Sequence, residues 1–102
     1  MSVYDTLRRA ITFKQCVRVL AAGRSRDICP HALGIKDGRP RLLAFQYDGG
    51  STSGLAPGGQ WRAFFLHEIA MASPIDGVWQ TGPNLLVKAE ACLDRVEYQA
   101  RP

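Results

Sequence analysis

Arginines are the side chains of this sequence that are best suited to binding chemistry. Ten of the thirteen cationic residues are arginine, whose planar guanidinium forms paired hydrogen bonds with carboxylates and phosphates. Residues 1–41 hold nine Lys or Arg against three acidic residues, whereas residues 42–102 hold four against six. A basic half of this kind attracts nucleic acid, a small anion or an acidic protein, although a solvated face without a specific partner has the same composition.

A glycine-rich stretch, GGSTSGLAPGG at residues 49–59, is the second feature that could bind a ligand. Its glycines would let backbone amides approach an anion closely. It is no P-loop, because neither the Lys followed by Ser or Thr nor the following helix is present. Two roles therefore stay open for Ser51 and Ser53: contact with a ligand, or hydrogen bonds to the loop's own backbone.

Cysteine and histidine are few and widely spaced. Cys29, His31, His67 and Cys92 would suit zinc if they converged, but they lack the regular pairs of known zinc modules, and buried residues of these types are the alternative. No catalytic motif is recognisable. We therefore expect a non-enzymatic chain without metal or cofactor. The odd number of cysteines favours reduced thiols, and because no apolar run approaches the ~20 residues that span a bilayer, we expect a cytoplasmic location and no membrane partner.

These residues must be positioned by a single domain spanning residues 1–102. The spacing of apolar residues predicts a helix over 1–14, with Ser2 as its N-cap. Alternating patterns then predict short strands within a barrel core at 16–72, followed by a C-terminal extension at 73–102. The fold class is mainly β: an SH3-like or Sm-like antiparallel barrel of about five strands.

Several local signals refine this prediction. In DICPHALGI, Ile28 and Leu33 fall on opposite faces, and Pro30 predicts an edge strand or a bulge. The pair Asp37-Gly38 predicts a hairpin turn. In RLLAFQY, Arg41, Leu43, Phe45 and Tyr47 share one face, while Leu42, Ala44 and Gln46 share the other. Because strands flank residues 49–59, that stretch is predicted to be a hairpin-type loop rather than a domain linker.

The end of the chain admits two interpretations. Residues 84–98 fit a helix with Asn84 as its cap, because apolar residues recur at helical spacing from Leu85 onward. The segment CLDRVEYQA also fits a last strand, with Val96 and Tyr98 on one face. Before it, Trp79 is expected to pack back on the sheet.

Residues 24–72 resemble the WYL-domain group, small Sm-like or SH3-like barrels found mostly in bacterial regulatory proteins. The resemblance rests on Arg26, on Pro30-His31-Ala32-Leu33-Gly34, on Phe45-Gln46-Tyr47, on Trp61-Arg62-Ala63-Phe64 and on Ile69. The naming tripeptide is absent, since Arg41-Leu42-Leu43 stands in its place. The chain is thus expected to be a divergent, stand-alone member.

The resemblance implies a regulatory, ligand-sensing module that binds an anionic small molecule, a nucleotide or a nucleic acid through basic and aromatic residues. Aromatic side chains beside arginines would suit stacking of nucleobases, although core packing is the alternative role for them. The candidate ligand-binding residues are Arg26, His31, Arg41, Tyr47, Ser51, Ser53 and Arg62. The competing hypothesis is a protein-interaction or scaffold subunit that self-associates, or docks on a regulatory partner protein, through sheet edges.

Overall fold

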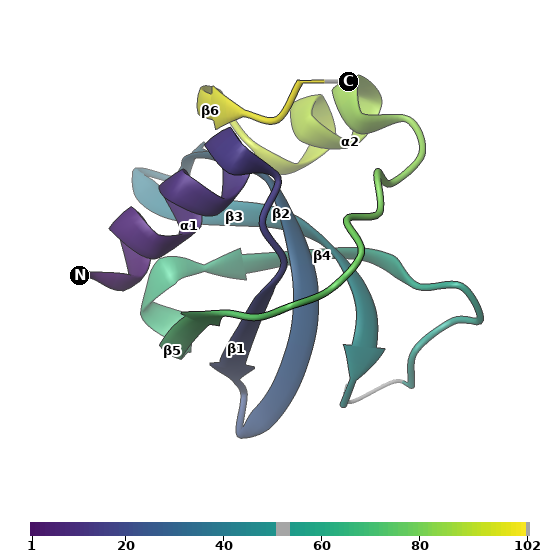
Figure 1. Cartoon of the computed structure of the whole chain (residues 1–102). Coiled ribbons are helices and arrows are strands. Elements are labelled where there is room, and N and C mark those ends of the chain that lie inside the picture. The colour runs from purple at the N-terminus through teal and green to yellow at the C-terminus, as the bar shows by residue number, and fades with distance from the viewer. Residues whose placement is uncertain (51–53, 102) are drawn as a thin grey trace.

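A computed structural model describes residues 1–50 and 54–101 of the chain. It contains two α-helices, one short 3-10 helix and six strands (Figure 1). In chain order the elements are α1 (Val3–Phe13), β1 (Val17–Ala21), β2 (Arg24–Lys36), β3 (Arg39–Gly49), β4 (Gln60–Phe65), the 3-10 helix η1 (Leu66–Glu68), β5 (Ile69–Pro74), α2 (Leu85–Cys92) and β6 (Arg95–Gln99). The chain is therefore mainly β, as its alternating patterns predict.

The predicted N-terminal helix is present as α1. The Ser2 hydroxyl accepts a hydrogen bond of 3.0 Å from the backbone N–H of Asp5, which satisfies one of the free donors at the helix start. Leu7 and Ile11, one turn apart, bury the apolar side of the helix. The helix ends at Lys14, whose φ of 52° is left-handed.

All six strands belong to one antiparallel sheet, in the order β4-β3-β2-β1-β5, with β6 paired to β2. This is one strand more than the sequence predicts. β4 and β5 are the first and last strands in this order, yet the chain connects them through η1 alone. In a flat sheet they would lie ~19 Å apart, whereas three 3-10 residues rise only ~6 Å. The sheet must therefore curl strongly, as the bend of β2 in Figure 1 illustrates.

A bulge in β2 corrects the predicted faces of that strand. β2 pairs with β3 along most of its length, with β1 up to Ile28 and with β6 from Ala32, so it is not an edge strand, although Pro30 itself is paired on the β3 side only. The register with β3 shifts between Pro30 and Ala32, which confirms the predicted bulge. The additional residue reverses the alternation beyond it. As a result Leu33 joins Ile28 in the same core cluster, and the predicted placement on opposite faces is wrong.

The predicted turn and the predicted faces of β3 are confirmed. Asp37 and Gly38 have φ angles of 52° and 74°, which suit the tight turn between β2 and β3. Leu42 and Ala44 join the main core. The two strands beside residues 49–59 pair with each other, so the predicted loop between paired strands is also present.

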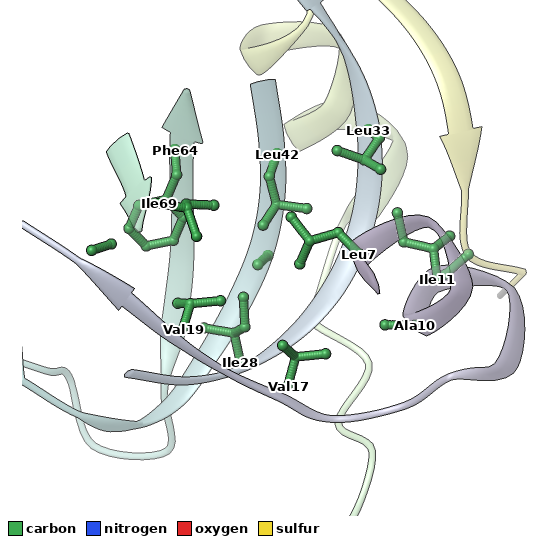
Figure 2. Packing of buried hydrophobic residues seen from close by; sticks show 13 residues of the cluster. Leu7, Ala10, Ile11, Val17, Val19, Ile28, Leu33, Leu42, Phe64 and Ile69 are labelled. Carbon is green, nitrogen blue, oxygen red and sulfur yellow. The ribbon is translucent and has the colours of Figure 1, made fainter. Parts of the chain in front are cut away.

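The sheet has two covered faces. Its inner face holds the main core, and α1 packs across one end of it (Figure 2). The largest side chains of this core are Leu7, Ile11, Val17, Val19, Ile28, Leu33, Leu42, Phe64 and Ile69. The outer face carries two smaller clusters, which are covered by α2 and by residues 75–83. The β1–β2 turn lies at the end of the sheet away from α1 (Figure 1).

Both interpretations of the C-terminal segment are partly right. The helix ends at Cys92, where Leu93 has already returned to extended backbone, and β6 follows from Arg95. Asn84 occupies the N-cap position as predicted, although its side chain makes no capping hydrogen bond. Trp79 packs on the sheet as expected, stacked on His31 at 4.8 Å.

The contact of α1 with the core predicts a large stability effect at Leu7. Leu7 is fully buried, so Leu7→Ala leaves a cavity and should lower the free energy of unfolding by about 2–5 kcal/mol in chemical denaturation. Leu86→Ala is the matched control, because Leu86 is 70% exposed, and it should change the same quantity by about 0.5 kcal/mol or less. Equal effects of the two variants would contradict the packing described.

Candidate functional site

The predicted ligand-binding residues divide between the two faces of the sheet. Arg26 and Arg62 lie on the inner face, since Arg26 covers the ring of Phe64 and Arg62 is two residues from Phe64 in β4. The outer face carries His31, Arg41 and Tyr47. Ser51 and Ser53 lie outside the described residues. The structure therefore does not bring the five described candidates, Arg26, His31, Arg41, Tyr47 and Arg62, into one site.

Arg26 is the most unusual of these residues because its charge is buried. The residue is only 5% exposed, and its guanidinium carbon lies 5.3 Å from the centre of the Phe64 ring. Its hydrogen bonds are long and go to uncharged acceptors, the carbonyl of Ala21 at 3.3 Å and Oε1 of Gln46 at 3.5 Å. Within residues 1–50 and 54–101, no carboxylate forms an ion pair with it.

The electrostatic surroundings of Arg26 oppose its charge. Burial lowers the pKa of its guanidinium, and the nearby positive charges of Arg62 and Arg24 lower that pKa further. The carboxylate of Glu68 raises it, but this effect is the weakest of the four. Because arginine retains its proton in proteins, Arg26 stays cationic despite these costs. We call Arg24, Arg26 and Arg62 the arginine cluster.

The two loop ends at residues 50 and 54 contact this cluster. Arg62 donates to the carbonyl of Gly54 at 3.1 Å, and the amide of Gln46 donates to the carbonyl of Gly50 at 3.1 Å. The aliphatic stem of Arg24 lies against Gly50, so closely that a Cβ there would be 3.3 Å from two of its carbons. The described flanks of the glycine-rich loop therefore lie beside Arg24 and Arg62.

His31 has a structural position on the outer face. It is 1% exposed and lies between Trp61 and Trp79, each with its ring centre 4.8 Å from the imidazole. Nε2 accepts the N–H of Gly82 at 3.2 Å, which leaves Nδ1 as the donor to the carbonyl of Cys29 at 2.6 Å. Both ring nitrogens are thus occupied, and burial lowers the pKa of the imidazole.

Tyr47 and Arg41 occupy two further, separate places. Tyr47 packs against the outer-face cluster of Cys16, Cys29 and Phe45, together with Ile75, and burial raises the pKa of its phenol. Arg41 donates to the carbonyl of Cys92 at 3.1 Å, and its guanidinium lies 4.8 Å from the centre of the Phe65 ring. Arg39 covers the same ring at 4.1 Å. Phe65 therefore packs against arginines of its own chain.

Sequence reasoning missed two members of the inner-face site, Arg24 and Gln46. Gln46 is fully buried, in agreement with the alternation of β3, which places it on the same face as Leu42 and Ala44. A polar residue on an otherwise apolar face was the available signal for a buried polar contact. Arg24 shows no such signal, because its approach depends on where Gly50 lies.

The described residues contain neither a metal-ligand group nor a membrane-spanning helix. No group of three or more His, Cys, Asp or Glu side chains there is placed to hold a metal ion. No helix in residues 1–50 and 54–101 has the length and apolar character needed to cross a membrane.

Comparisons with protein families, with curated proteins and with solved structures give no match for this chain.

The buried imidazole predicts a pH-dependent stability. The folded chain binds a proton at His31 less readily than the unfolded chain, whose histidine has the ordinary pKa of 6.5. The contribution of neutral His31 to the free energy of unfolding is therefore complete above pH 6.5, and that free energy should fall as the pH drops below 6.5. Urea unfolding at a series of pH values measures this dependence.

His31→Gln should flatten that dependence, whereas His67→Gln, at an exposed position, should retain it. If both variants kept the wild-type slope between pH 7 and 5, titration of His31 would not be its cause.

Proposed function

We propose that the chain is a non-enzymatic binding module that takes a phosphate-bearing anion, a nucleotide or a nucleic acid, at the arginine cluster. The observation that carries the proposal is the burial of Arg26, 5% exposed, without an ion pair in the described part of the chain. A buried cation of this kind is costly unless an anion lies beside it. A bound phosphate would supply the missing negative charge.

The hydrogen-bonding capacity of the cluster supports an oxyanion ligand. Guanidinium groups donate in a fixed planar fork that matches phosphate oxygens. Nε of Arg62 is buried and has no partner among the described residues. Arg24 is exposed and Arg62 half-buried, so a ligand would approach from the solvent side of these two residues and reach Arg26 last.

We also propose that the curled sheet closes as a small SH3-like or Sm-like barrel related to the WYL-domain group. The support is that β4 and β5, at opposite ends of the sheet order, are joined by only three residues. The ligand sensing that the WYL resemblance implies also relies on basic residues, and two of its candidate positions, Arg26 and Arg62, belong to the arginine cluster. A regulatory role in the cytoplasm follows as part of this proposal.

Anion binding predicts a specific loss in Arg62→Gln. We expect binding of inorganic pyrophosphate to be about ten- to a hundredfold weaker by calorimetry, because a charge-assisted hydrogen bond contributes about 1.5–3 kcal/mol. We expect the same variant to bind a labelled single-stranded oligonucleotide more weakly in fluorescence anisotropy. The slope of log affinity against log salt should become shallower by about 0.7, which corresponds to one lost phosphate contact.

Arg8→Gln is the matched control for net charge. Arg8 lies on α1, over the ring of Tyr98, and away from the cluster. It should bind pyrophosphate like the wild type. Equal weakening in both variants would indicate unspecific charge attraction, and an affinity that does not depend on salt would exclude phosphate contacts; either result contradicts the proposal.

A second candidate function, which is an alternative to closure of the sheet between β4 and β5, is self-association through the edge of β5. Among the described strands, β5 pairs on one side only, with β1. Its Met71 is 60% exposed and lies opposite Leu20 of β1, itself 36% exposed. Unpaired strand edges with exposed apolar residues readily pair with another chain. We infer that a second copy of this chain would add to the β5 edge.

Sedimentation velocity over a wide concentration range tests this inference. We expect the wild type to associate as its concentration rises and Met71→Lys to remain monomeric, because a lysine on an edge strand opposes pairing. Val78→Lys, at an 81% exposed position outside the strands, should associate like the wild type. A wild type that stays monomeric throughout would contradict self-association.

A further inference from the structure

A pair of cysteines lies outside the arginine cluster, between the first two strands. Cys16 immediately precedes β1 and Cys29 lies in β2; the ladder of these strands ends at Val17 opposite Ile28, and its continuation by one position would set Cys16 opposite Cys29. Their sulfur atoms are 3.8 Å apart, and both residues are buried, at 1% and 0% exposure. The two thiols thus form a contact pair inside the outer-face cluster that also holds Phe45.

The backbone geometry at this pair suits a disulfide. Directly opposed residues of an antiparallel ladder have Cα atoms about 4.5–5.5 Å apart. Disulfides in proteins join Cα atoms about 4.4–6.8 Å apart, so a continued ladder would accommodate the bond without a movement of the strands. Only side-chain rotation is needed to bring the sulfur atoms of Cys16 and Cys29 into bonding distance.

Residues 75–83 cover the pair and bond directly to it. The N–H of Gln80 lies 3.3 Å from the sulfur of Cys29, and the N–H of Ile75 donates to the carbonyl of Cys16 at 3.0 Å. Gly77 lies so close that a Cβ there would be 3.2 Å from the Cys16 sulfur. Any reagent must therefore pass this segment to reach either thiol.

We propose that Cys16 and Cys29 form a redox site at which a peroxide closes a disulfide between β1 and β2. One sulfur attacks a peroxide oxygen, which breaks the O–O bond, releases one water and leaves a sulfenic acid. The second sulfur then displaces that hydroxyl as a second water, and the S–S bond forms. The two thiols lose two electrons and two protons in total, and the peroxide accepts them.

The closed segment restrains this reaction. Burial raises the pKa of the Cys29 thiol to about 12, so it is protonated and unreactive while residues 75–83 cover it. Opening of that segment admits both peroxide and water, which restores the thiolate. The rate of disulfide formation therefore reports how often residues 75–83 open, and this role is independent of the arginine cluster.

Cys92→Ala provides the test, since it leaves only this pair of thiols. The variant is treated with hydrogen peroxide under native conditions, alkylated and examined by intact mass and peptide mapping. We expect a mass lower by two hydrogens and a cross-link between the peptides that contain Cys16 and Cys29. Dithiothreitol should reverse both changes, and the oxidised form should have the higher thermal midpoint.

The control, Cys16→Ser combined with Cys92→Ala, should form no cross-link within the chain. The proposal is overturned if native Cys92→Ala keeps both thiols free under peroxide, or if it gains oxygen atoms without a cross-link. It is also overturned if the cross-link forms only at urea concentrations that unfold the protein, because the site would then not belong to the folded state.

Discussion

One strand, β2, constrains the rest of the molecule. It hydrogen-bonds with β1, β3 and β6, so every other part of the sheet is placed relative to it. The register shift after Pro30 lets this strand serve two packing environments: Ile28 and Leu33 reach the inner core on either side of the shift, while His31 occupies the outer face at the shift itself. The same strand supplies Arg26 to the opposite end of the sheet from α1. Burial of the apolar residues of β2 on both faces holds these polar side chains in place.

The contrast between His31 and Arg26 follows from their side-chain chemistry. A buried imidazole can become neutral, and His31 does so with both nitrogens hydrogen-bonded, so it completes the structure and leaves nothing for a ligand. A guanidinium cannot discharge in this way, and Arg26 is buried beside two further arginines. Burial thus leaves His31 neutral with both nitrogens hydrogen-bonded, and it leaves Arg26 charged without a carboxylate partner among the described residues. For this reason we assign the proposed anion site to Arg26 on the inner face, and not to His31 and the two tryptophans around it on the outer face.

Local patterns in the sequence predicted most helices, strands and turns, whereas features that depend on contacts between distant segments could not be predicted. The cap at Ser2, the turn at Asp37-Gly38 and the faces of β3 depend on neighbouring residues, so they could be predicted. The bulge could be anticipated at Pro30, but its effect on Leu33 could not, because the position of an additional residue depends on the partner strand. For the candidate site, the basic character of Arg26 and Arg62 was evident from the sequence. The separation of His31, Arg41 and Tyr47 from them was not, because it depends on which face of the sheet each side chain occupies.

The central claim is that the arginine cluster is built for an anion, and side-chain NMR of arginine addresses it directly. The Nε–Hε resonances are followed while sodium phosphate replaces sodium chloride at constant ionic strength. The account predicts saturable shifts for Arg26 and Arg62, with the resonance of Arg18, already paired with Asp27 at 2.8 Å, unchanged. Unchanged resonances for Arg26 and Arg62, or equal unsaturable shifts of all arginines, would contradict it.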